Sequence, residues 1–112
     1  MKFETIHSSN IPILRLEGKL IGEAVSVLKN EMDEQINKSG GRLVLDLSNV
    51  PLMDSSALGI IVATLQDLKK ENGKLVLLNP QKAVANVLSI TRLDSIFEIY
   101  KDEKKAIDSF QL

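Results

Sequence analysis

Alternating polar and apolar positions mark two short strands at the start of the chain. Residues 3–7 and 11–17 both have strand character, and the polar residues 8–10 between them predict the turn of a β-hairpin. In the second strand, Leu14 and Leu16 alternate with charged residues. This alternation is typical of a half-buried strand near a sheet edge.

Helical and strand patterns then follow one another. From about Glu23, apolar residues recur every three or four positions, which predicts an amphipathic helix that ends at the glycine pair 40–41. Two nearly continuous apolar runs of strand length come next, residues 43–47 and 75–78, with a helix between them from about residue 55 to 71. Strands that are apolar on both faces belong in the centre of a parallel sheet covered by helices.

The last third of the chain adds a helix after Pro80, a short strand over residues 96–100 and a terminal helix over 103–110. The order ββαβαβαβα with right-handed crossovers predicts a single α/β domain over residues 1–112. Its mixed central sheet takes an antiparallel part from the early β-hairpin, and the helices pack on the sheet. Partners of such folds meet the loops at the carboxyl ends of the parallel strands, here the turn after Leu47.

Composition narrows the class of protein. The formal net charge is −1, with acids and bases mixed along the chain, so we expect neither nucleic acid nor an anionic membrane as a partner. The absence of cysteine excludes disulfides and thiolate metal sites. The N-terminus lacks the apolar stretch of a signal peptide, and the apolar run 57–63 is far shorter than the roughly 20 residues that span a bilayer. We therefore expect a cytoplasmic protein without direct membrane insertion.

The turn after the first buried strand carries the candidate chemistry. Asp54 and Ser55 are both good N-cap residues, so capping alone is the simplest explanation of the cluster. If residues 58, 61, 62, 65 and 68 form the buried stripe, Ser55 lies roughly 60° from Leu58, at the stripe's edge, and Ser56 roughly 160° away. This projection predicts that Ser56 is the exposed hydroxyl.

Ile60 falls on the same predicted outer face, near Ser56. Two interpretations remain open: a stray surface apolar residue, which is common, or an anchor for a partner beside the serine. A phosphate on Ser56 would sit at a helix N-terminus, where the free amides and the dipole tolerate an anion. Phosphorylation should then change partner binding and leave the fold intact.

Residues 53–59, Met-Asp-Ser-Ser-Ala-Leu-Gly, following Leu-Asp-Leu at 45–47, resemble the phosphorylation loop of the STAS domain. This family is shared by anti-sigma factor antagonists and the cytoplasmic tails of sulfate transporters. The segments 16–20, 73–80 and 91–94 are also similar to the family, so the resemblance spans nearly the whole chain.

The resemblance implies an anti-sigma factor antagonist whose phosphoacceptor is Ser56. The unmodified protein would bind an anti-sigma factor that is also a serine kinase, phosphorylation would release it, and a phosphatase would reset the switch. Asp54, Ser55, Ala57 and Ile21 would belong to the partner-binding surface with Ser56 and Ile60. Weak nucleotide binding is a further implication of the family, and the oligomeric state stays open.

This sequence departs from the family pattern at three positions. Ala57 stands where the motif usually has glycine, Ile21 where an acidic residue is common, and Arg92 where glycine is usual. Two alternatives within the family are an STAS subunit of a membrane transport complex, for example of the phospholipid type, and a scaffold in stress signalling.

Enzymatic activity is not expected. The only histidine is His7, in the first strand, and nothing in the pattern brings it near Ser56 as a base. The loop is not a Gly-x-Ser-x-Gly nucleophile elbow, and the sequence contains no phosphate-binding glycine motif or cluster of metal ligands. We therefore expect a binding module without a catalytic residue, a metal or an obligatory cofactor.

Overall fold

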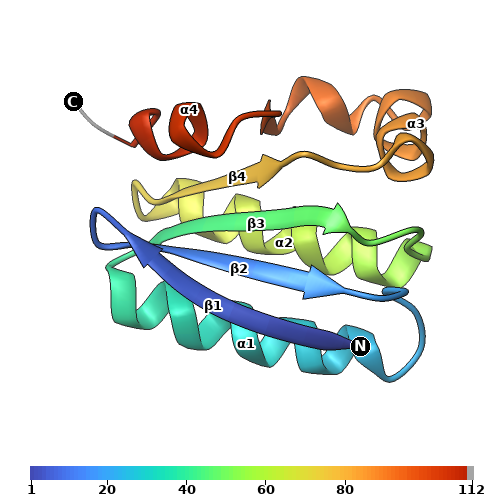
Figure 1. Ribbon diagram of the computed structural model, residues 1–112, viewed down its shortest axis with the longest axis horizontal. Helices are drawn as coiled ribbons and strands as arrows, with labels where there is room; N and C mark the ends of the chain where they lie inside the picture. The colour runs from blue at the N-terminus through green and yellow to red at the C-terminus, as the bar shows by residue number, and fades with distance from the viewer. Residues whose placement is uncertain (111–112) are drawn as a thin grey trace.

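Five strands form one mixed sheet in the order β1-β2-β3-β4-β5. The computed structural model describes residues 1–110. In Figure 1 the arrowheads of β2, β3 and β4 point one way and that of β1 the other, because only the β1–β2 pair is antiparallel. The strands are β1 (Lys2–Ser8), β2 (Ile11–Glu17), β3 (Arg42–Asn49), β4 (Lys74–Leu78) and β5 (Glu98–Tyr100).

The helices alternate with the parallel strands as the sequence predicts. They are α1 (Ala24–Ser39), α2 (Ser55–Lys70), α3 (Lys82–Ile90) and α4 (Glu103–Asp108), with a 3₁₀ turn at Leu93–Ser95. The predicted order and the mixed α/β sheet are both confirmed. No helix within residues 1–110 combines the length and the apolar character needed to cross a membrane.

The β1–β2 connection is a two-residue turn. Ser8 pairs with Ile11, and the intervening Ser9 and Asn10 both have positive φ, at 53° and 64°. This conformation matches the twist of antiparallel strands, as in type I′ hairpin turns. The predicted hairpin is therefore present, with a turn one residue shorter than its polar run.

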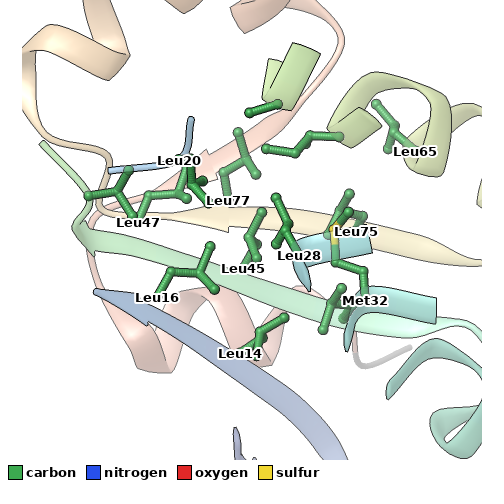
Figure 2. Packing of buried hydrophobic residues seen from close by; sticks show 14 of the residues in the cluster. Leu14, Leu16, Leu20, Leu28, Met32, Leu45, Leu47, Leu65, Leu75 and Leu77 are labelled. Carbon is green, nitrogen blue, oxygen red and sulfur yellow. The ribbon is translucent and has the colours of Figure 1, made fainter. Parts of the chain in front are cut away.

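The larger core lies between one face of the sheet and helices α1, α2 and α3. Figure 2 shows leucines of β2, β3 and β4 packed against side chains of α1 and α2. The fully buried members include Leu14, Leu16, Leu28, Met32, Leu43, Leu45, Leu47, Leu75 and Leu77. Because this core fixes the strands against two long helices, the loops at the carboxyl ends of β2 and β3 start from a rigid base.

Helix α4 covers part of the opposite face of the sheet. A second buried cluster joins Ala106 and Ile107 of α4 to Ile11, Ile13, Val44, Val76 and Leu78 of the strands. The prediction of a half-buried β2 is therefore wrong over its first half, where Ile13 is as inaccessible as Leu14. The reason is tertiary: β2 pairs with β1 and β3 on its two sides, and α4 returns to cover its second face.

Two elements near the C-terminus are shorter than predicted. Strand β5 begins at Glu98, not at residue 96, because the 3₁₀ turn leads into Phe97, which is buried in the larger core. Helix α4 ends at Asp108, two residues before the predicted end, and Ser109 forms its C-cap. Neither difference changes the order of the elements.

Candidate functional site

Backbone hydrogen bonds join the loop after β2 to the loop after β3. The amide of Leu20 donates to the carbonyl of Leu52 at 3.0 Å, and the amide of Asp54 donates to the carbonyl of Leu20 at 3.1 Å. Nearer the strands, the Gly18 amide donates to the Asn49 carbonyl at 3.0 Å. The segment before α2 is therefore held along the segment before α1, so Ile21 belongs to the same surface as the start of α2.

Asp54 connects the two loops through its side chain. Its Oδ1 atom accepts hydrogen bonds from the Ala57 amide at 2.9 Å and from the Ser56 hydroxyl at 2.8 Å. Its Oδ2 atom accepts one from the Gly22 amide at 3.3 Å. The predicted N-cap role of Asp54 is confirmed, and α2 begins at Ser55.

These contacts favour the charged form of the Asp54 carboxyl. The hydrogen bond from the Ala57 amide is the largest cause that lowers its pKa below the ordinary value of 3.8, followed by the bond from the Ser56 hydroxyl. The Gly22 amide acts in the same direction. At neutral pH, Asp54 is therefore a carboxylate that orients the Ser56 hydroxyl.

The projection that separated the two serines is wrong. Ser55 is exposed, as Ser56 is, because the buried stripe of α2 consists of Ala57, Ile61, Thr64, Leu65 and Leu68. The direction of the core turns by roughly 50° round the helix when the buried stripe includes Ala57 and Thr64 and leaves out Leu58 and Val62. Both serines then lie about 130° from it. Of the two serine hydroxyls, only that of Ser56 hydrogen-bonds to Asp54 within residues 1–110, and this bond distinguishes Ser56 from Ser55.

The apolar residues predicted to surround Ser56 on the partner-binding surface differ in their exposure. Ile60 is half-buried and packs against the larger core, so the structure contradicts its placement on the outer face of α2. Ile21 is 42% exposed, and the sequence interpretation missed Leu52, which is 40% exposed on the adjoining loop. Ala57 is fully buried, so its side chain is part of the core and not of the accessible surface.

Two further contacts of this region carried no signal in the sequence. In the sequence pattern, Gly22 only marks a break between elements. In the structure, Gly22 has a φ of 57°, and its amide donates a hydrogen bond to Asp54. The side-chain amide of Gln81, before α3, donates to the Ser48 carbonyl at 2.8 Å and ties a third loop to the end of β3. Within residues 1–110 there is no group of three His, Cys, Asp or Glu side chains that could hold a metal.

Comparisons with known proteins agree with this fold. The family model of the STAS domain matches residues 2–106. A Thermotoga neapolitana protein, provisionally described as an anti-sigma factor antagonist, is 39% identical over 79 residues, covering 70% of each chain. The anti-sigma F factor antagonist of Paenibacillus polymyxa is 27% identical over 113 residues, covering 100% of this chain and 97% of its own.

A solved structure supports the same assignment. The crystal structure of a Thermotoga maritima protein, also provisionally described as an anti-sigma factor antagonist, matches with a TM-score of 0.90 at 30% identity. The match covers 98% of this chain and 95% of that one. Since the family model and this structure both span nearly all the elements described above, the chain belongs to the STAS domain family.

Proposed function

We propose that this protein is an anti-sigma factor antagonist that binds an anti-sigma factor in the cytoplasm and is switched off by phosphorylation of Ser56. The observation that carries the proposal is the exposed Ser56 hydroxyl in the first turn of α2, held by the carboxylate of Asp54 at 2.8 Å. The names of the two relatives and of the structural neighbour support the class of partner.

The position of Ser56 suits a modification that acts on binding. A phosphate adds a charge of about −1.5 to −2, and the N-terminus of a helix tolerates such a charge. Ser56 is exposed, so the fold can accommodate the added volume. The exposed side chains of Ile21 and Leu52 on the adjoining loops give a partner an apolar contact next to the serine. Charge placed there would have to be desolvated on docking, which weakens the complex.

The chain supplies the acceptor and the partner supplies the remaining chemistry. In the transfer, a bond forms between Ser56 Oγ and the terminal phosphorus of a nucleoside triphosphate held by the kinase. The bond from that phosphorus to its bridging oxygen breaks, and the hydroxyl proton passes to a base of the kinase. Asp54 orients the hydroxyl before transfer. A phosphatase would reverse the modification by hydrolysis of the same ester.

The test is phosphate incorporation by an anti-sigma factor kinase, to be sought among the genes next to the one that encodes this protein. We expect wild type and Ser55→Ala to be labelled and Ser56→Ala to remain unlabelled. A pull-down of the kinase then compares wild type with Ser56→Asp, and only wild type should retain it. Labelling mapped to Ser55, or equal retention of the kinase by both proteins, would contradict the proposal.

A further inference from the structure

One carboxylate holds both loops of the candidate site. Asp54 Oδ1 accepts from the Ser56 hydroxyl and the Ala57 amide on α2, whereas Oδ2 accepts from the Gly22 amide in the loop before α1. The two oxygens rotate together, so a change at one oxygen moves the other. The backbone directly after Ile21 is therefore bonded to the same carboxylate that orients Ser56.

A phosphoryl group on Ser56 would remove the hydrogen bond between Ser56 and Asp54. An ester oxygen has no proton, so it cannot donate the hydrogen bond that now joins it to Oδ1 at 2.8 Å. The phosphate also places a second anion beside the Asp54 carboxylate, and like charges at such short range repel. The carboxylate is thus expected to rotate away from the modified side chain.

The contact on the other side is the weaker one. The bond from the Gly22 amide is 3.3 Å long, just beyond the usual range of about 2.7–3.2 Å for such bonds, and Gly22 is exposed. The backbone bond from the Asp54 amide to Leu20, at 3.1 Å, does not involve the carboxylate. Rotation of the Asp54 side chain would consequently free the Gly22 amide while the two loops stay joined through their backbones.

We infer that Asp54 relays the phosphorylation state of Ser56 to the loop between β2 and α1, so that modification frees the Gly22 amide beside Ile21 as well as adding charge to α2. The inference rests on the proposed function for its biological use, because it describes how modification of that same serine would regulate binding. It adds a second consequence of phosphorylation: two parts of the partner surface change together.

The experiment installs phosphoserine at position 56 during translation, which requires no kinase. The chemical shift and exchange rate of the Gly22 amide proton are measured by NMR in modified and unmodified protein. We expect an upfield shift and a severalfold faster exchange of the Gly22 amide, because its carboxylate acceptor is lost. The Leu20 amide, bonded to the Leu52 carbonyl, is the internal reference and should not change.

Two variants isolate the relay. In Asp54→Ala, the Gly22 amide should already have the released shift, and phosphoserine at position 56 should add nothing. Phosphoserine at position 55 is the matched charge control, since the Ser55 hydroxyl does not bond Asp54 within the described residues, and it should produce a smaller shift.

The relay is overturned if phosphoserine at position 56 leaves the Gly22 amide unchanged, or shifts it equally in Asp54→Ala. An equal shift from position 55 would also overturn it, because the Ser56–Asp54 bond would then have no role. These outcomes do not depend on a kinase. Failure of kinase labelling would instead contradict the proposed function.

Discussion

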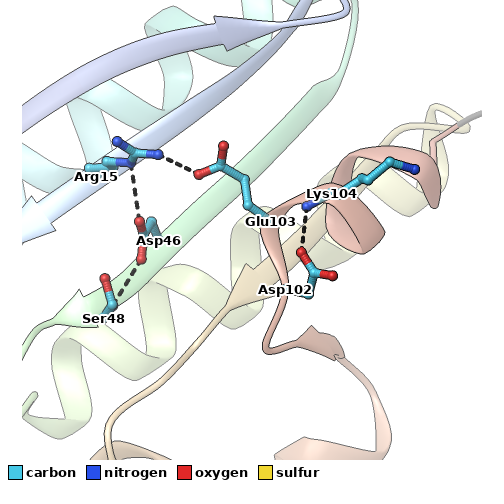
Figure 3. Close-up of polar contacts among 6 residues, drawn as sticks. All are labelled: Arg15, Asp46, Ser48, Asp102, Glu103 and Lys104. Atoms are coloured by element: carbon cyan, nitrogen blue, oxygen red, sulfur yellow. Dashed lines mark hydrogen bonds and ion pairs between the residues drawn. The ribbon is translucent and has the colours of Figure 1, made fainter.

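The Nε atom of Arg15 lies 3.3 Å from the Oδ2 atom of Asp46, joining β2 to β3 where the two residues are direct partners in the parallel register. Figure 3 shows that Arg15 also reaches Glu103, the first residue of α4. Asp46 Oδ1 in addition accepts from the Ser48 amide at 2.9 Å. The cluster of Arg15, Asp46 and Glu103 therefore holds the start of α4 over the sheet. Through the bond to the Ser48 amide, it also shapes the end of β3, where the candidate site begins.

Replacing Asp46 with alanine should destabilise the domain. Asp46 is only 7% exposed, and its loss leaves the Ser48 amide without its acceptor and the Arg15 guanidinium without its more buried anion. We expect a loss of about 1–3 kcal/mol in the free energy of unfolding, the usual cost of an unpaired, largely buried polar group. Urea denaturation followed by circular dichroism measures it.

Glu103→Gln is the matched control for the same cluster. The Glu103 side chain is 45% exposed, so its ion pair with Arg15 is screened by solvent, and the loss should not exceed about 1 kcal/mol. Equal losses for Asp46→Ala and Glu103→Gln would show that burial of Asp46 does not determine the strength of this cluster.

Two glycines should respond to alanine in opposite directions. A Cβ on Gly73 would lie 2.7 Å from the Gly41 carbonyl oxygen and 2.8 Å from Leu68 Cδ2, so the β4 entry would have to shift. We expect Gly73→Ala to cost about 1–3 kcal/mol, as overpacking usually does. At Gly59, inside α2, a Cβ would meet no neighbouring group within 4 Å, and Gly59→Ala should stabilise by about 0.5–1 kcal/mol. Thermal unfolding would refute the steric argument if both variants moved the midpoint the same way.

The element order was readable from the sequence because β3 and β4 contain short, nearly continuous apolar runs between periodic helices. The orientation of α2 was not, because Ala57 and Thr64 are buried although one is small and the other polar. Leu58 and Val62 have the stronger hydrophobic signal but lie at the border of the core. The bond from Gly22 to Asp54 was equally hidden, since a backbone amide has no residue-type signature.

The contribution of Asp54 to stability should depend on pH. Its pKa is lowered in the folded state by the bonds from the Ala57 amide, the Ser56 hydroxyl and the Gly22 amide. The stabilisation is therefore present above the unfolded value of 3.8 and is lost as the pH falls through the lower folded pKa. We expect wild type to unfold at a higher urea concentration than Asp54→Ala at pH 7. This difference in urea midpoint should narrow below about pH 4. A gap that stays constant as the pH falls to about 2.5 would contradict the shift, since other carboxyl groups titrate alike in both proteins.

Charged substitutions at Ile60 and Ile21 should have different effects on folding. Ile60 is half-buried against the larger core, so Ile60→Glu removes packing and places a charge against it. We expect a loss of at least about 1 kcal/mol in the free energy of unfolding, from roughly half the burial energy of an isoleucine side chain. Ile21 is 42% exposed on the neighbouring loop, and Ile21→Glu should stay within about 0.5 kcal/mol of wild type. Urea titrations of the two variants measure the difference, and partner-binding assays can then use Ile21→Glu without loss of the fold. If Ile60→Glu proved as stable as Ile21→Glu, that result would contradict the packing of Ile60 against the core. It would instead support the prediction from the sequence that Ile60 lies on the outer face of α2.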